Sequence, residues 1–278
     1  MSAVALSSVA SSAGEPQDTP DSTLSALRRA VADIAAAPRG DMRGETRLPL
    51  GLAPLDRALD GGLDRGAIHE IGPAAPRDGG AATGFAVALA VLALRWGGQA
   101  VWIRPDFAAA EAGELYGPGL ASMGLSLSRL VVLKVPRPRD ALWAMEEALQ
   151  CRAAGAVVTE LTGDDADLTA TRRLALAAGA GGGLGLLLRH QPNREPNAAM
   201  TRWEVASSSG ERDGFGGLAR STFAVSLVKN RHGPTGQWRL SWDHHERVFV
   251  PALSALSRPV AAAALDRSPH PQRLARTG

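Results

Sequence analysis

The sequence predicts an α/β protein with a mainly parallel sheet, flanked by helices and closed by antiparallel edge strands. Short apolar runs alternate with helix-length segments between residues 67 and 189, which is typical of βαβ units. These runs are almost continuously apolar, as expected of strands covered on both faces. After Gln191 the residues alternate in polarity around Gly233-Pro-Thr-Gly236, a pattern typical of a hairpin.

The first half of the expected core begins with a short helix over 50–59, closed by Gly61-Gly62. Its parallel strands are expected where β-branched or leucine-rich runs stand alone, and its helices where apolar residues extend over three turns. In order, we expect a strand over 67–71, a helix over 82–96, a strand over 100–103, a helical segment over 111–123 interrupted by Gly117-Pro118-Gly119, and a strand over 130–135.

The second half continues the alternation and then changes its rhythm. We expect a helix over 140–153 with Asp140 as its cap, because aspartate accepts hydrogen bonds from the first free amides of a helix. The remaining expected elements are a strand over 156–161, a helix over 167–178, a strand over 184–189, and antiparallel strands over 202–205, 223–227 and 238–242.

Four segments follow one another along the chain. Residues 1–20 are rich in Ser, Ala, Pro and Asp and are expected to be a disordered tail. Residues 21–47 are expected to form an N-terminal helix and a charged linker, and residues 48–250 the compact core. Residues 251–278 are rich in Ala, Pro and Arg and are expected to be a second disordered tail.

Composition excludes several classes of protein. The chain has 278 residues, a formal net charge of +2 and a single cysteine, Cys151, so we expect neither a disulfide framework nor a multi-cysteine metal site. No secretory signal is evident, and the longest apolar stretch, 86–94, is half the length that spans a bilayer. We expect a cytoplasmic protein that contacts no membrane, without a catalytic nucleophile arrangement.

The most informative stretch runs from Ile68 to Phe85 and has the layout of a nucleotide-binding loop. A strand, a turn at Gly72-Pro73, small residues and a helix from about Ala82 stand where a P-loop belongs. A P-loop reads G-x-x-x-x-G-K-[ST], with glycine amides around the phosphates and a lysine on the outer phosphates. Counted from Gly72, these three positions hold Arg77, Asp78 and Gly79. The alternative is an ordinary strand-to-helix turn.

Three polar residues follow expected strands at their carboxyl ends. Glu160 is in position to hold magnesium, or is a solvated strand-end carboxylate. Asp106 stands where a carboxylate activates water, and Gln191 can sense a nucleotide or cap its strand. Lys229 and Arg231 form a basic pair at the end of an edge strand, suited to phosphate or to another subunit, or simply a charged turn.

Several stretches resemble a known family when they are taken in order. Residues 52–73 resemble the lead-in to the P-loop of RecA recombinases, and residues 226–231 are similar to the RecA segment Val-Val-Lys-Asn-Lys. Residues 114–130 and 198–203 are similar to stretches typical of ImuA, the RecA-like family of damage-inducible mutagenesis proteins, which includes SulA-like members. The resemblance covers residues 48–250.

The resemblance implies a RecA-like P-loop NTPase-type core that serves SOS-induced translesion synthesis and mutagenesis. It implies an ImuB-type Y-family polymerase relative, an error-prone DnaE-type polymerase and RecA as partners, with DNA contact, self-association and a nucleoid location after damage. Because Arg77 and Asp78 replace the P-loop glycine and lysine, we expect a non-enzymatic accessory protein without a cofactor.

The resemblance also implies roles for individual residues. Lys229 and Arg231 match the RecA basic pair that reaches nucleotide across a filament interface, Gln191 matches the glutamine that couples nucleotide to the DNA-binding loop, and Asp106 lies where RecA has its catalytic glutamate. The segment after Gln191 corresponds to the DNA-binding loop. It holds Arg194, Arg202 and Trp203, which suit phosphate contact and one stacking platform.

Two other functions stay open at this point. One is a DNA-stimulated ATPase with a divergent loop, in which ATP and magnesium bind and Arg77 replaces the lysine. The other is a cell-division inhibitor of the SulA type. Nucleotide binding separates the first from an adaptor, and a division block on overexpression separates the second.

Overall fold

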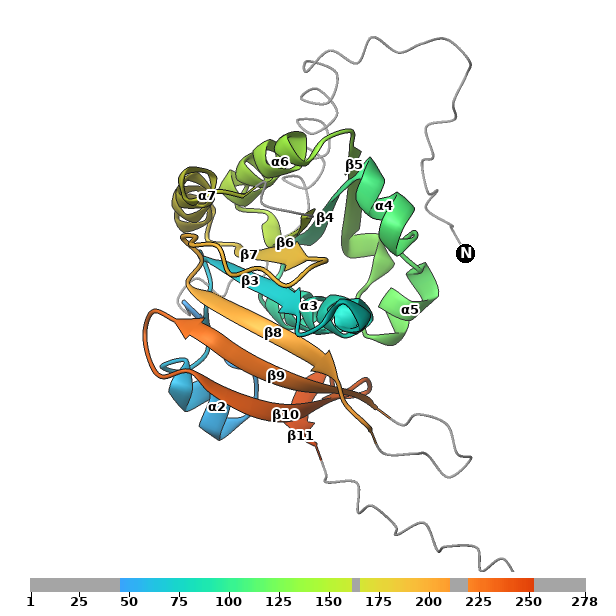
Figure 1. The fold of residues 1–278 in the computed structure, drawn as a ribbon, viewed down its shortest axis with the longest axis vertical. Helices are drawn as coiled ribbons and strands as arrows, with labels where there is room; N and C mark the ends of the chain where they lie inside the picture. The colour runs from blue at the N-terminus through green and yellow to red at the C-terminus, as the bar shows by residue number, and fades with distance from the viewer. Residues whose placement is uncertain (1–45, 162–165, 211–219, 253–278) are drawn as a thin grey trace, which may run out of the picture.

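The computed structural model describes residues 46–161, 166–210 and 220–252. The tails and the N-terminal helix expected before residue 46 and after residue 252 lie outside these residues. The described part forms the α/β core that the sequence predicts (Figure 1).

Within the described residues, nine strands form one sheet in the order β11-β10-β9-β8-β3-β7-β6-β4-β5. The strands from β8 to β5 are parallel, and β9, β10 and β11 add an antiparallel edge. Their bounds are β3 Ile68–Pro73, β4 Gln99–Pro105, β5 Leu130–Val135, β6 Ala154–Leu161, β7 Leu184–Arg189, β8 Thr201–Ser207, β9 Ser221–Asn230, β10 Gly236–Asp243 and β11 Val248–Pro251. A separate short pair joins β1 (Arg47–Leu48) to β2 (Leu63–Asp64). The fold is a RecA-like core.

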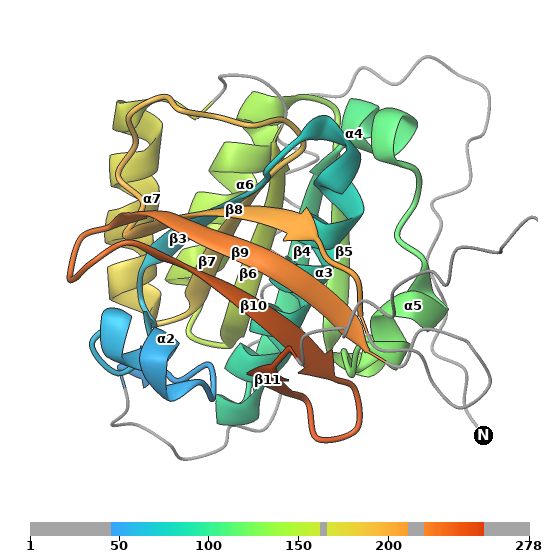
Figure 2. The same ribbon diagram turned by 60° about the horizontal axis from the view of Figure 1, so that its bottom comes forward.

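Helices cover the two faces of the sheet (Figures 1 and 2). One face packs on α3 (Gly79–Ala93), with α2 (Ala53–Ala58) and α5 (Gly117–Ser122) beside it. The opposite face of β3, β4, β5, β6 and β7 packs on α6 (Pro138–Gln150) and α7 (Leu168–Gly181), and that face of β8 is not part of this packing. Strands between two apolar layers need apolar residues on both faces, which explains the continuous runs in the sequence.

The central helix α3 is almost entirely buried. With the short 3-10 turns at its two ends it spans Pro76–Trp96, which is long and apolar enough to cross a membrane by length and composition. This apolar segment is longer than the run 86–94 on which our expectation rested. However, 61% of its most apolar window is buried inside the domain. The ring centroid of Phe85 lies 5.6 Å from that of Trp203 and 5.5 Å from that of Phe249. These aromatic contacts place α3 at the centre of the core.

Several helix starts differ from the sequence prediction. Helix α4 (Asp106–Ala112) begins at the end of β4, five residues earlier than predicted, and α5 begins at Gly117 rather than being interrupted there. Helix α6 starts at Pro138, and Asp140 binds the Arg137 side chain instead of a free amide. Proline lies in the first turn of α5 and of α6. It is tolerated there because a backbone N–H at this position would have no acceptor within the helix. Asp167 does cap α7, through Ala170 N at 2.6 Å.

Candidate functional site

The segment between β3 and α3 does not turn where the sequence predicts. The strand continues through Gly72 and Pro73, which pair in parallel with β8, and the Ala74 amide extends this pairing to Val205 O at 2.9 Å. A 3-10 turn over Pro76–Asp78 then leads into α3, which begins at Gly79 rather than near Ala82. The backbone N–H of Ala74 is therefore hydrogen-bonded within the sheet, to Val205 O.

Asp78, which the sequence predicts at the position of the P-loop lysine, turns its side chain toward β8. Its Oδ1 accepts hydrogen bonds from the backbone N–H of Ser207 at 3.1 Å and from the Ser207 hydroxyl at 2.9 Å. The carboxylate is buried, and the hydrogen bond from the Ser207 backbone holds its pKa below the ordinary value. The neighbouring Arg77 is exposed. Asp78 therefore ties the start of α3 to the end of β8.

A pocket with a volume of about 260 Å³ lies beside the first turns of α3, at the carboxyl ends of the parallel strands. Gly80, Thr83 and Gly84 line it from α3, and Tyr116 and Leu120 line it from the segment around α5. Four further polar residues line it: Arg104, Glu114, Glu160 and His190. Neither Arg77 nor Asp78 is part of this lining.

Glu160, at the carboxyl end of β6, is buried among donors. Trp102 Nε1 donates to its Oε1 at 2.6 Å, and Arg104 Nη2 donates to its Oε2 at 3.1 Å. His190 Nε2 lies 3.0 Å from the same Oε2. Arg104 is also buried and donates to Gly113 O, so its guanidinium joins β4 to the chain before α5. Both members of this salt bridge therefore have further partners: Trp102 and His190 contact Glu160, and Gly113 O accepts from Arg104.

The charge of Glu160 is stabilised from within the protein. Burial raises the pKa of this carboxyl, but the hydrogen bonds from His190 and Trp102 and the charge of Arg104 together lower it below the ordinary value. Magnesium is usually held by one or two carboxylates together with the phosphate oxygens of its substrate. A carboxylate already neutralised by Arg104, with no lysine in the loop, does not fit a magnesium–ATP complex.

Asp106 and Gln191 do not join this cluster. Both are exposed, Asp106 as the first residue of α4 and Gln191 after the end of β7, and neither lines the pocket. Arg104 and His190, which stand two and one positions earlier, reach Glu160 instead. The sequence did hold a sign of this, since Arg104 shares the strand face of the apolar Trp102 and a charge there needs a partner. In the described residues there is no group of three His, Cys, Asp or Glu that could hold a metal.

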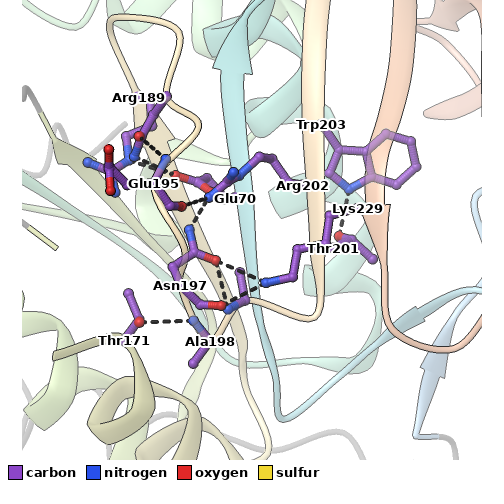
Figure 3. A network of polar contacts seen from close by, with 12 residues as sticks. Glu70, Thr171, Arg189, Glu195, Asn197, Ala198, Thr201, Arg202, Trp203 and Lys229 are labelled. Carbon is purple, nitrogen blue, oxygen red and sulfur yellow. Dashed lines mark hydrogen bonds and ion pairs between the residues drawn. The ribbon is translucent and has the colours of Figure 1, made fainter. Parts of the chain in front are cut away.

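A second buried cluster centres on Glu70 in the middle of β3 (Figure 3). Its Oε1 accepts from Arg189 Nε at 2.8 Å, and its Oε2 accepts from Asn197 Nδ2 and Arg202 Nε, each at 2.5 Å. Both β7 and β8 flank β3, so residues 190–200 must cross over it, and they do so without a helix. The backbone of such a crossing needs partners. The cluster supplies them, because Arg202 also donates to Glu195 O.

Lys229 belongs to this second cluster. Its Nζ donates to Asn197 O at 2.7 Å and lies 3.3 Å from Asn197 Oδ1, so it supports the crossing (Figure 3). Burial, followed by the charges of Arg231 and Arg202, lowers the pKa of Lys229. Arg231 follows the strand and is exposed. The basic pair predicted from sequence is thus divided between a structural residue and a surface residue.

The predicted stacking platform is wrong for Trp203. This side chain is fully buried under α3, against Phe85, and its indole N–H donates to Thr201 Oγ1 at 2.8 Å. A strand buries alternate residues, so Trp203 and Val205 face the core while Arg202 and Glu204 face away. Arg194 is exposed on the crossing segment, and Arg202 is engaged with Glu70.

The fold defines a RecA-like domain, and a buried aspartate, Asp78, stands in the segment that joins β3 to α3. No protein-family model matches the chain. Two proteins named Protein ImuA, from two strains of Caulobacter vibrioides, are each 32% identical to it over 197 residues, which cover 65% of this chain and 76% of theirs. The chain belongs to the ImuA family.

Proposed function

We propose that this protein is a non-enzymatic accessory factor of SOS-induced translesion synthesis and mutagenesis. In this role it docks with an ImuB-type Y-family polymerase relative, an error-prone DnaE-type polymerase or RecA, in the cytoplasm and on the nucleoid after DNA damage. Membership of the ImuA family supports the link to damage-inducible mutagenesis. The partners come from the family resemblance of the sequence.

The contacts of Asp78 support the proposal that the protein is not an enzyme. Asp78 stands where the lysine would reach the outer phosphates, and it is committed to Ser207 by two hydrogen bonds. A phosphate in the loop would meet no cation from this position, and the buried carboxylate of Asp78 would repel it. The backbone N–H of Ala74 donates to Val205 O, so it is not free to donate to a phosphate. We therefore propose that neither ATP nor magnesium is a cofactor.

Nucleotide binding and hydrolysis test the proposal. Purified protein is titrated with a fluorescent ATP analogue and magnesium, with and without DNA, and hydrolysis is followed in the same mixtures. The proposal expects no saturable binding at millimolar nucleotide. Hydrolysis that Asp78→Ala abolishes would establish the DNA-stimulated ATPase instead. The matched control is Asp140→Ala, a change of the same kind on α6.

A deletion strain tests the cellular role. We expect loss of damage-induced mutagenesis and unchanged filament length, because the proposed role lies in lesion bypass. Restoration of mutagenesis by the wild-type gene, and by the Asp78→Ala variant, would support a role that needs no nucleotide. A division block on overexpression, with mutagenesis intact in the deletion strain, would establish the SulA-type inhibitor.

A further inference from the structure

The antiparallel strands leave one face of the sheet open. This open face consists of Arg202, Glu204 and Ala206 of β8, Ala224, Ser226 and Lys229 of β9, and Gln237 and Arg239 of β10. All of these residues are half-buried or exposed. Among the described elements, no helix lies over these strands on the side away from α3 (Figure 2). Sheet faces in α/β proteins are ordinarily covered by a helix.

The strand register arranges the open face in three rows. Ala206, Ala224 and Arg239 form the first row, and Glu204, Ser226 and Gln237 form the second. Arg202 and Lys229 form the third, with the exposed Arg231 one residue beyond Asn230. Cations therefore stand at both ends of the face. Four residues of strand, or about 13 Å, separate the first row from the third.

Small side chains form much of the open face: Ala206 and Ala224 lie in the row of Arg239, and Ser226 lies in the middle row. A partner can therefore approach the backbone closely there. Glu204 stands in the row between the cations. In the third row, Lys229 is bonded to Asn197 and Arg202 to Glu70, so Arg231 is the exposed cation at this end.

This charge pattern fits a protein helix better than a nucleic acid. A phosphodiester chain is uniformly negative, so it would place charge against Glu204 as it crosses from one row of cations to the other. A helix rises 1.5 Å per residue, so acidic residues about eight positions apart reach both ends, while small or apolar residues between them pack on Ala224 and Ser226. The open face has no exposed aromatic ring on which bases could stack.

We propose that the open face docks a helix of a partner protein, through acidic residues that meet Arg239 at one end and Arg231 at the other. The inference rests on the proposed function, since it assigns the surface by which the accessory protein holds its partner. It requires no nucleotide and does not involve the pocket beside α3.

Two substitutions on the open face test it, together with a control on another face. Arg239→Glu reverses the charge of one end, and Ala224→Arg places a long cation on the small-residue surface beside Arg239. The control, Arg172→Glu, makes the same charge reversal on the exposed surface of α7. Circular dichroism and urea unfolding establish that each full-length variant is folded. Affinity is then measured for the purified ImuB-type partner, for RecA, and for single-stranded and duplex oligonucleotides of 30 nucleotides, a length of about two to three helical turns.

The expected result is binding of one protein partner by the wild type, weakened at least tenfold by Arg239→Glu and by Ala224→Arg and changed less than twofold by Arg172→Glu. Amide exchange of β9 and β10 should slow in the complex. Wild-type binding that both open-face variants retain would overturn the inference and leave the proposed function standing. Binding of neither protein would remove the proposed function and the inference with it.

A nucleic-acid site gives a different pattern on the same variants. Ala224→Arg adds a cation, so it would tighten the binding of an oligonucleotide while Arg239→Glu weakens it. Because steric blocking of a helix predicts weaker binding for Ala224→Arg, this outcome would replace the protein partner by nucleic acid. The single-stranded and duplex arms would then identify the form that binds.

Discussion

Asp78 and Ser207 are joined by two hydrogen bonds, at 3.1 Å from the backbone N–H and 2.9 Å from the hydroxyl, across 129 residues of sequence. They connect the first residue before α3 with the last residue of β8. The Asp78 side chain is therefore a structural contact that ties the segment between β3 and α3 to the sheet.

Substitution of Asp78 should lower stability. Asp78→Ala removes both hydrogen bonds and leaves the Ser207 amide without its acceptor, so we expect a loss of about 2 kcal/mol in the free energy of unfolding. Urea unfolding measures it. Ser207→Ala removes only the hydroxyl bond and should cost about 1 kcal/mol. An Asp78→Ala variant as stable as the wild type would show that this contact contributes nothing.

The buried Glu70 should be the most sensitive acidic residue. Glu70→Gln keeps the size of the side chain but leaves Arg189 and Arg202 without their carboxylate, and the loss should reach about 3–5 kcal/mol. The control Glu204→Gln, on the open face, should change stability by about 0.5 kcal/mol or less. Faster amide exchange over residues 190–200 in Glu70→Gln would locate the effect. Equal stability of the two variants would contradict it.

Arg104 and Glu160 should show strong coupling. Arg104→Met leaves Glu160 buried without its cation and should cost about 3 kcal/mol or more. Adding Glu160→Met removes the unpaired charge, so the double variant should be more stable than Arg104→Met alone. A double-mutant cycle from urea unfolding at pH 7 measures this. Additive losses would mean that the two groups do not interact.

His69 should make stability depend on pH. Burial lowers its pKa to about 4, while Asp64 O and Thr201 Oγ1 hold its two ring nitrogens at 2.9 and 2.8 Å. The unfolded chain binds a proton near pH 6.5 and the folded protein does not. Stability is thus fully present above pH 6.5, and about 2 kcal/mol is lost by pH 5. Unfolding in urea at pH 8 and pH 5 gives this difference.

The control for this titration is an exposed histidine. His245→Asn should keep the whole pH dependence, since its ring is solvated, whereas His69→Asn should remove most of it while lowering stability at pH 8. A His69→Asn variant with the wild-type pH dependence would assign the effect to another group.

The parallel strands could be predicted from the sequence because continuous apolar runs leave few alternatives. The helix starts were harder. Gly117-Pro118-Gly119 looks like an interruption, but proline in a first turn begins a helix as readily as it breaks one. Strand β11 was missed because it is only four residues long and follows a charged turn.

The site was less predictable, because its contacts join residues far apart in the chain. Glu70 meets Arg189 after 119 residues and Arg202 after 132, and no local pattern encodes such pairs. Trp203 is different. It alternates with Arg202 and Glu204, and that period of two already placed it on the buried side of the strand. The resemblance to a DNA-binding loop led us to expect it on the surface.

We propose that the segment between β3 and α3, predicted as a nucleotide loop, is a structural joint that binds no nucleotide. Equilibrium binding of a labelled ATP analogue to the wild type, and to the double variant Arg77→Gly with Asp78→Lys, tests it most directly. We predict no saturable binding by the wild type at millimolar nucleotide with magnesium, in the presence or absence of DNA. Saturable, magnesium-dependent binding by the wild type that the Asp78→Ala substitution weakens would contradict the claim. Binding gained only by the double variant would leave the claim intact and show that the rest of the loop can still accept phosphate.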